Sequence, residues 1–300
     1  MCRSQALIPK PPDWGDHINI SGFSFLDKAS DYDPPEDLVE FLEAGPPPVY
    51  IGFGSIVIDD PAKLTDMIFG AVKRLGVRAL VSKGWGNLGK GKDVPENVFL
   101  LGNVPHDWLF KYVSAVVHHG GAGTTAIGIA TGKPTVVVPF FGDQAFWGGM
   151  IYRAGAGPEP IPYKKMTEES LVESITTALK PETRTAVQKM SQQIGKENGA
   201  ADAAKSFHKA INMDTMRCMI CPDHVAVWRV KKTNIRLSSL AASVLLDQGV
   251  LKLMNLKLWA ILPMRFDCVL TKTRIRHRNW YIDEGAPDPL LGIVATGAGE

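Results

Sequence analysis

Residues 118–125, HHGGAGTT, combine two adjacent histidines with three glycines and two threonines. The stretch follows the apolar residues SAVV and precedes AIGIATG, so it joins an expected strand to an expected helix. Glycines at 120, 121 and 123 allow close approach of the backbone, and the N–H groups of a first helical turn favour a phosphate or pyrophosphate. His119 would add a hydrogen-bond donor. This pattern predicts an anion-binding loop.

Other interpretations of the same residues stay open. The glycines would also serve a tight strand-to-helix turn that binds no ligand. The spacing differs from the dinucleotide-binding fingerprint G-x-G-x-x-G, and no acidic residue follows at the distance that this fingerprint requires. A buried His119 would simply cap the turn, and His118 is expected to be structural.

The elements that must position this loop alternate between strand and helix from residue 49 onward. Strands are expected within 48–55, 77–82, 97–102, 114–119 and 134–140. Helices are expected within 59–76, 105–112, 122–132, 143–155, 167–180, 181–197 and 199–211. Two further short strands are expected at 18–25 and 156–161. This alternation predicts an α/β fold with a doubly wound parallel sheet.

Three domains or segments follow from these patterns. Residues 1–48 are rich in proline and acidic residues and are expected to form a connecting arm. Residues 49–212 form the predicted α/β domain. Residues 213–300 lack the alternation, so we expect an extension that is partly helical and partly irregular.

Ligands of an open parallel sheet bind beyond the carboxyl ends of its strands. Three loops of this chain are expected there: GFGS at 52–55, HHGGAGTT at 118–125 and PFFGDQ at 139–144. Their side chains should therefore gather at one edge of the sheet.

Composition excludes several classes of protein. The net charge is +2 over 300 residues, so no strong nucleic-acid footprint is present. No apolar run approaches the ~20 residues of a membrane span, and the N-terminal residues lack a signal-peptide core, which predicts a cytoplasmic protein. Four cysteines are too few for a disulfide scaffold. Cys218, Cys221 and His224 have the spacing of half a zinc site, but no second pair follows, so no metal is expected.

The three loops in this order resemble the nucleotide-sugar-binding half of UDP-dependent glycosyltransferases with the two-domain GT-B fold. The likeness is strongest to fungal sterol 3-beta-glucosyltransferases. It covers roughly residues 9–212 and rests on the segments PPPVYIGFGSIV, SKGWGNLG, NVFLLGNVPHDWLF and VVHHGGAGTTAIGIATGKPTVVVPFFGDQAFWG.

The resemblance implies a role for each residue that matches the family's motifs. His119, Gly121, Gly123 and Thr124 would contact the diphosphate, with Ser55 approaching from the neighbouring loop. Asp143 and Gln144 would bind the glucose hydroxyls, although Asp143 would also suit a helix N-cap. The backbone of Val104 would bind the uracil edge. Plant relatives place a stacking tryptophan where Asn103 stands, so Trp85 is expected to substitute for it. Trp85 and Trp147 would equally suit packing roles.

The implied reaction is inverting transfer of glucose from UDP-glucose to a sterol or similar lipid hydroxyl, without a cofactor or metal. His119 would stabilise the leaving diphosphate. The base and the acceptor pocket belong to the family's N-terminal domain, which we expect to be missing from this chain. The alternative is a nucleotide-sugar-binding module without turnover.

The expected partners are therefore UDP-glucose and, through that N-terminal domain, a sterol or lipid. No nucleic-acid partner is expected. The basic run KTRIRHR at 272–278 would suit contact with an anionic membrane or with RNA, or it forms a solvated charged face.

Overall fold

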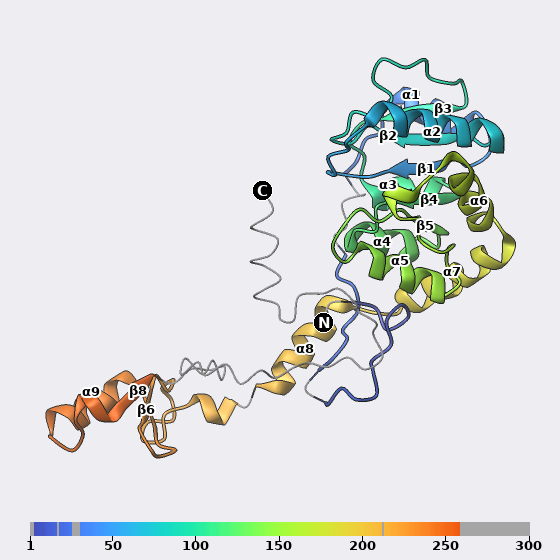
Figure 1. The fold of residues 1–300 in the computed structure, drawn as a ribbon. Helices are drawn as coiled ribbons and strands as arrows, with labels where there is room; N and C mark the ends of the chain where they lie inside the picture. Colours follow the sequence, from blue (N-terminus) through green and yellow to red (C-terminus); the bar gives the residue numbers. More distant parts are fainter. Residues whose placement is uncertain (1–2, 17, 26–30, 212, 259–300) are drawn as a thin grey trace. The chain divides into compact units, whose positions relative to one another are not determined.

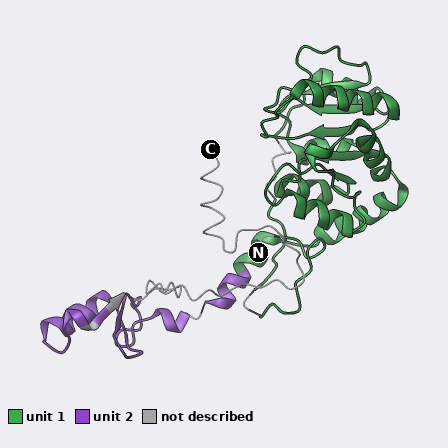
Figure 2. Cartoon of the chain, in the orientation of Figure 1, with its two compact units in different colours: residues 1–204 green, residues 205–300 purple. Residues whose placement is uncertain are grey.

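The computed structural model describes residues 3–16, 18–25, 31–211 and 213–258. The chain divides into two compact units, residues 1–204 and residues 205–300 (Figure 2). The division falls inside a helix, α8 (Gly199–Ala210), whereas the predicted domain boundary follows residue 212. The predicted arm, residues 1–48, belongs to the first unit.

The first unit is built on a five-stranded parallel sheet with the order β3-β2-β1-β4-β5 (Figure 1). All five strands lie within the ranges that the sequence predicts. The strands are β1 (Val49–Gly52), β2 (Ala79–Ser82), β3 (Val98–Leu101), β4 (Ala115–His118) and β5 (Thr135–Val137). The predicted α/β fold with a parallel sheet is confirmed.

Alternate residues of the central strands face two separate cores. In β1, Val49 and Ile51 pack with α2 (Pro61–Leu75) and α6 (Glu168–Ala178). Tyr50, between them, faces the opposite core with α1 (Glu36–Glu43), α3 (His106–Leu109) and the 3-10 helix η1 (Phe110–Tyr112). Because side chains alternate across a strand, a strand covered on both faces reads as a continuous apolar run. Helices on both faces make the sheet doubly wound.

Helix α2 begins and ends where its sequence signals predict. The Asp60 side chain accepts a hydrogen bond from the N–H of Lys63 at 2.9 Å, and Pro61 occupies the first turn. Gly76 ends the helix in the left-handed conformation, with φ of 63°. Helices α4 (Ala122–Ala130), α5 (Gln144–Arg153) and α7 (Pro181–Ile194) also lie within predicted ranges.

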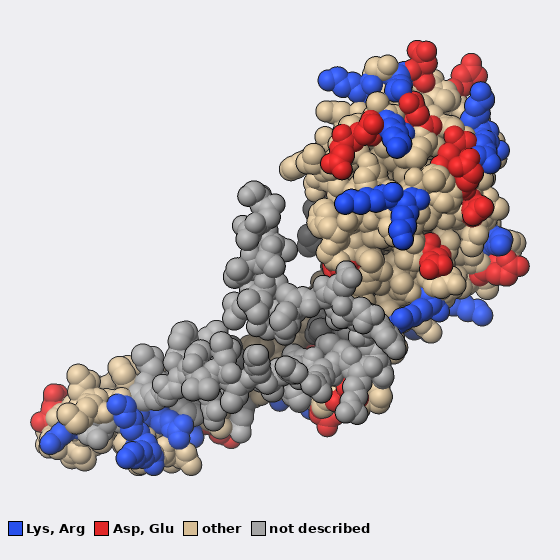
Figure 3. Space-filling view, viewed as in Figure 1, with Lys and Arg blue, Asp and Glu red and all other residues tan. Residues whose placement is uncertain are grey.

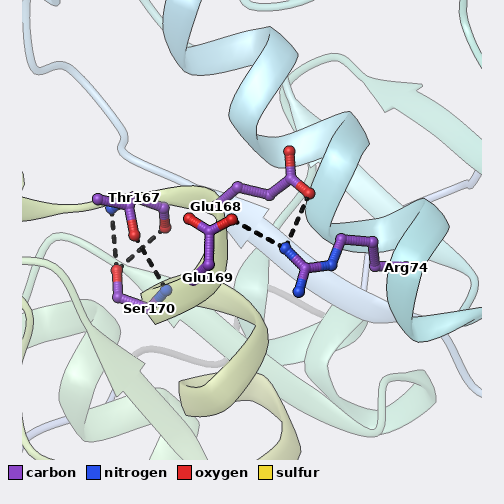
Figure 4. Close-up of polar contacts among 5 residues, drawn as sticks. All are labelled: Arg74, Thr167, Glu168, Glu169 and Ser170. Carbon is purple, nitrogen blue, oxygen red and sulfur yellow. Dashed lines mark hydrogen bonds and ion pairs between the residues drawn. The ribbon is translucent and has the colours of Figure 1, made fainter.

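Helix α6 is fixed at its first turn by polar contacts (Figure 4). Thr167 and Ser170 form a capping box, with hydrogen bonds of 3.2 and 2.9 Å between each side chain and the other residue's backbone N–H. Arg74 of α2 pairs with Glu168 at 3.2 Å and Glu169 at 3.1 Å. These contacts join α2 to α6 on one face of the sheet.

Two predicted short strands are wrong, and one helix was missed. Residues 18–25 form no strand; instead, the N–H of Gly22 donates to the carbonyl of Arg3 at 2.9 Å. Residues 156–161 form no strand either, because Pro158 and Pro160 lack the N–H groups that a ladder needs. This segment keeps only two backbone hydrogen bonds to β5. The arm, in turn, contains a helix, α1, that the sequence analysis missed.

The second unit contains a small antiparallel sheet in the order β7-β6-β8, which was not predicted. The strands of this sheet are β6 (Trp228–Val230), β7 (Arg236–Leu237) and β8 (Leu256–Leu258). The second unit also contains the 3-10 helices η3 (Met213–Met216) and η4 (Leu253–Asn255) and the helix α9 (Ser239–Asp247). The basic run at 272–278 lies outside the described residues. Within the described part of the chain, no helix has the length and apolar character to cross a membrane.

Candidate functional site

The candidate site lies at the carboxyl edge of the sheet, where the direction of strand addition reverses. The chain passes from β1 outward to β2 and β3 and then returns to β4 on the other side of β1. Loops that leave β1 and β4 therefore diverge and leave a crevice between them, which is where ligands of such sheets bind. The loops stay in contact at their base: a Cβ on Gly54, whose φ is +64°, would lie 3.3 Å from Cε1 of His119.

The loop after β4 presents the start of α4 to this crevice. His118 is fully buried, and its Nδ1 accepts a hydrogen bond from the N–H of Gly120 at 2.9 Å. Gly120 has φ of +90°, and a Cβ there would lie 2.9 Å from the carbonyl oxygen of Gln144. Only glycine therefore fits this turn. Gly121 is the N-cap residue of α4 and caps the helix with no side chain, so N–H groups of the first turn are open to a ligand.

His119 is the half-buried histidine of the pair. Its Nδ1 is buried and has no hydrogen-bond partner in the described part of the chain. Burial lowers the pKa of His119, while the nearby charge of Asp143 opposes this shift. The imidazole is therefore neutral at neutral pH and can donate one hydrogen bond. His118, by contrast, has a pKa lowered to about 3 by burial and is structural, as the sequence analysis expected.

The loop after β5 contains Asp143 and Gln144. Gln144 is buried, and its Oε1 accepts hydrogen bonds from the N–H groups of Phe140 at 2.7 Å and Phe141 at 3.1 Å. Asp143 is exposed, and its Oδ2 accepts a hydrogen bond from Trp147 Nε1 at 2.8 Å. Asp143 occupies the N-cap position of α5 without capping it through its side chain.

Two neighbouring cavities adjoin these loops. The first, of about 490 Å³, is lined by Ser55, Trp85 and Val104 among the predicted residues. The second, of about 750 Å³, is lined by Val104, Gly123 and Thr124. His119, Gly121, Asp143 and Gln144 line neither of them. His119 adjoins the first cavity through Gly54, and Asp143 adjoins the second through Trp147.

For Trp85 and Trp147, the structure distinguishes accessibility to a ligand from packing. Trp85 is 74% exposed at the rim of the first cavity, so its ring is accessible to a ligand. Trp147 is 1% exposed and packs in the interior, with the guanidinium of Arg3 4.7 Å from its ring centroid. Trp147 therefore supports the site by holding Asp143.

Lys83, His106 and Arg3 are among the lining residues of these cavities that sequence reasoning did not assign to the site. Lys83 directly follows the last residue of β2, so its place at the carboxyl edge could have revealed it. His106 lines both cavities, and its Nε2 lies 3.1 Å from the hydroxyl of Tyr50. Burial raises the pKa of Tyr50 to about 12, so this phenol is neutral. Arg3 is brought to the site by the arm, which no local pattern indicated.

The described residues include no group of three or more His, Cys, Asp and Glu side chains placed to hold a metal ion. Cys218 is buried in the second unit, and its Sγ accepts a hydrogen bond from the N–H of Cys221 at 3.3 Å. These two cysteines therefore form a local turn within the second unit.

Two sterol glucosyltransferases each match about two thirds of the chain. A sterol 3-beta-glucosyltransferase of Arabidopsis thaliana is 48% identical over 207 residues, which cover 69% of this chain and 34% of that protein. A sterol 3-beta-glucosyltransferase of Leptosphaeria maculans is 37% identical over 220 residues, covering 70% of this chain and 15% of that protein. The chain thus spans about a third or less of the length of these relatives.

Solved structures share the fold of the first unit. The glycosyltransferase of kitacinnamycin superposes with a TM-score of 0.57 at 18% identity, covering 69% of this chain and 53% of that chain. CalG4, the calicheamicin glycosyltransferase, superposes with a TM-score of 0.52 at 19% identity, covering 63% of this chain and 46% of that chain. At these identities the likeness shows the GT-B type of α/β fold.

A family model described as the C-terminal domain of erythromycin biosynthesis protein CIII-like proteins matches residues 70–208. This range contains the loops after β4 and β5 and most of the residues that line the two cavities. Together with the sterol glucosyltransferase relatives, the match shows that residues 70–208 form an EryCIII-like C-terminal glycosyltransferase domain.

Proposed function

We propose that the first unit binds UDP-glucose and acts as the donor half of a glucosyltransferase whose acceptor is a sterol or similar lipid hydroxyl. The observation that carries this proposal is the start of α4. Its first turn has no side-chain cap, and the half-buried ring of His119 lies beside it, with Nε2 nearest Gly121, at the point where strand order reverses. A diphosphate is the group that these donors suit. The names of the relatives support glucose as the sugar and a sterol as the acceptor.

The diphosphate binds at the N–H groups of Gly123 and Thr124, with His119 donating from one side and Ser55 from the loop after β1. When the bond between the anomeric carbon and the diphosphate oxygen breaks, its electron pair moves to the diphosphate. Donors that are already oriented toward this oxygen stabilise the negative charge that develops there. A neutral His119 fits this role because it donates a hydrogen bond before and during bond breaking.

The uracil and the sugar occupy opposite sides of the diphosphate. The uracil ring enters the cavity that is lined by Ser55, Trp85 and Val104, where the exposed ring of Trp85 offers a stacking surface. The exposed carboxylate of Asp143 and the amide nitrogen of Gln144 bind the glucose hydroxyls. Trp147 holds the Asp143 carboxylate, and the backbone of residues 140–141 fixes the Gln144 amide.

Inverting transfer requires a base on the face of the sugar opposite the diphosphate. His119 and Asp143 lie with the donor loops, so we assign this base and the acceptor pocket to a second domain outside the donor half. The donor half by itself should therefore bind the donor without glucosylating sterol. Transfer of radiolabelled glucose to sterol by this chain alone would contradict the division of roles.

Binding of UDP tests the donor site directly. Calorimetry should show saturable UDP binding, and His119→Ala should weaken it by about tenfold, since a hydrogen bond to a charged group is lost. His208→Ala, at an exposed histidine of α8, is the matched control and should leave the affinity unchanged. Equal losses in both variants, or no heat with millimolar UDP, would overturn the proposal.

Peripheral membrane contact of a cytoplasmic protein is a further part of the proposal. Residues 205–258 contain nine Lys and Arg against three Asp and Glu. Figure 3 shows Lys and Arg gathered on the described surface of the second unit. Such a surface favours an anionic leaflet, where a sterol acceptor would be found. Sedimentation with vesicles that contain phosphatidylserine should retain the chain at low salt and release it at high salt.

A further inference from the structure

A separate cavity, of about 1120 Å³, lies at the amino edge of the parallel sheet, away from the donor loops. Its wall includes residues that directly or closely precede four strands: Pro47 before β1, Arg78 before β2, Ser114 before β4 and Lys133 before β5. Helices α1 and α7 contribute further parts of the wall, as do residues of α3 and η1. Because the donor loops leave the opposite ends of these strands, this cavity is no part of the donor site.

Positive side chains predominate in this cavity. Four basic residues line it, and Glu43 is the single carboxylate among its lining residues. The basic residues are Arg78, Lys111, Lys133 and Arg184. Helix carboxyl ends point toward the amino edge of such a sheet, so cations could be explained as partners of helix carbonyl groups.

Helix carbonyl groups account for only part of this charge. Arg78 donates to the carbonyl groups of Phe41 and Pro46 at the end of α1. The end of α4 is capped by hydroxyl groups: Ser191 Oγ donates to the carbonyl of Ala130 at 2.6 Å, and Thr131 donates within the same turn. The described residues therefore assign no cation to the carbonyl groups of α4.

The three remaining cations lack a negative partner. Lys133 Nζ donates to the carbonyl of Lys111 at 3.2 Å, which leaves two of its N–H donors. The side chains of Lys111 and Arg184 have no hydrogen bond or ion pair in the part of the chain that the structure describes. Burial, reinforced by the charge of Arg184, lowers the pKa of Lys133. Two positive groups thus repel each other here, and a bound anion would relieve this repulsion.

The cavity also has apolar and aromatic walls beside the cations. Val39 and Leu42 of α1 and the rings of Trp108 and Tyr112 line it. The Trp108 and Tyr112 rings lie with centroids 4.8 Å apart, and Tyr112 is 46% exposed. These surfaces suit a ligand that joins an anionic group to an apolar part.

We propose that this cavity binds a phosphate group attached to an apolar moiety, with Lys111, Lys133 and Arg184 holding the phosphate and the α1 and aromatic residues contacting the apolar part. The phosphate is supplied either by a phospholipid headgroup or by a free phosphate compound. Arginine and lysine together suit it because they combine a planar double donor with a compact charge.

Calorimetry with two probes distinguishes these sources. Dihexanoyl phosphatidic acid should bind saturably, and more tightly than inorganic phosphate if the headgroup of a lipid is the source. Equal affinity for both probes would show that the apolar walls contribute nothing to binding and would overturn the proposed contact with an apolar moiety. Saturating UDP should not displace either probe, because UDP is assigned to the opposite edge of the sheet; displacement by UDP would overturn the proposal.

Two charge reversals on α7 test which residues hold the phosphate. Arg184→Glu should lower the affinity for the more tightly bound probe by about tenfold or more, because a charge-assisted hydrogen bond is lost and a repulsion is introduced. Lys189→Glu, also exposed on α7 but absent from this cavity, should change the affinity less than about twofold. Arg184→Gln provides a milder version if the reversal disturbs folding. Equal weakening by both reversals, or no saturable binding of either probe, would refute the site.

Discussion

His118→Asn tests the structural role of the first histidine of the pair. His118 is 0% exposed, and burial lowers its pKa to about 3 from the ordinary value of 6.5. Asparagine keeps an acceptor near the position of Nδ1 for the N–H of Gly120 but has no titrating group. The substitution should therefore remove one source of pH dependence and retain the turn before α4.

The sign and size of this effect follow from the difference in pKa. A histidine with a depressed pKa contributes stability that is complete above pH 6.5, the unfolded value, and is lost as the pH falls toward the folded value of about 3. Within this window each pH unit costs about 1.4 kcal/mol per group. Between pH 7.5 and pH 5, His118 alone should therefore lower the free energy of unfolding by about 2 kcal/mol.

Urea unfolding followed by tryptophan fluorescence at these two pH values measures the effect. The unmodified chain should lose more stability than the variant on going from pH 7.5 to pH 5, by about 2 kcal/mol. The absolute stability of the variant is immaterial, because the comparison uses only the change with pH. An identical pH dependence in both proteins would refute the assignment of a buried, neutral His118.

Three further experiments, which use five substitutions, test the loops and the helix that support the site. Gly120→Ala should destabilise the chain by about 1–3 kcal/mol in urea unfolding, because of its positive φ and the contact with Gln144. Gly149→Ala, with open space at its Cβ inside α5, should be neutral or slightly stabilising in the same experiment. Thr167→Ala should cost about 1 kcal/mol by removing the capping box of α6, and Arg74→Ala should cost less, because its ion pairs are exposed; a larger loss for Arg74 would contradict this order in urea titrations. Trp147→Phe removes the donor that holds Asp143 and should weaken UDP-glucose more than UDP in calorimetry, while equal weakening would show that Asp143 does not contact the sugar.

The sequence predicted the parts of the fold that local signals determine. The five strands are short apolar runs followed by helices with clear caps, such as Asp60 and Gly76 around α2, and these patterns lead directly to a doubly wound sheet. The rule that ligands bind at the carboxyl edge then placed the three loops together, because it depends only on strand direction.

Local patterns failed where distant contacts decide the structure. The apolar residues of 18–25 look like a strand, but no sheet edge receives them, and they bond to the backbone of Arg3. Prolines at 158 and 160 interrupt what was predicted as a strand. Helix α1 was missed because flanking prolines suggested a linker, although Leu38 is buried in the core beside Tyr50.

In the candidate site too, local sequence predicted some features, while others depend on contacts between distant residues. Glycines with positive φ and the start of α4 could be inferred from the loop sequence, since each follows from backbone geometry. The hydrogen bond from Trp147 to Asp143, the contact of His106 with Tyr50 and the approach of Arg3 required the tertiary structure. These residues come from different elements, and no spacing along the chain relates them.

Hydrogen exchange of backbone amides, with and without UDP-glucose, tests the central claim most directly, because it locates the ligand on the chain. The account predicts slower exchange in the loop after β4 and the first turn of α4, residues 119–125, together with residues 53–55 and 140–144. Residues 131–134 at the amino edge should exchange at the same rate in both states. Protection confined to the amino edge, or no protection at residues 119–125 under saturating UDP-glucose, would contradict the assignment of the donor site.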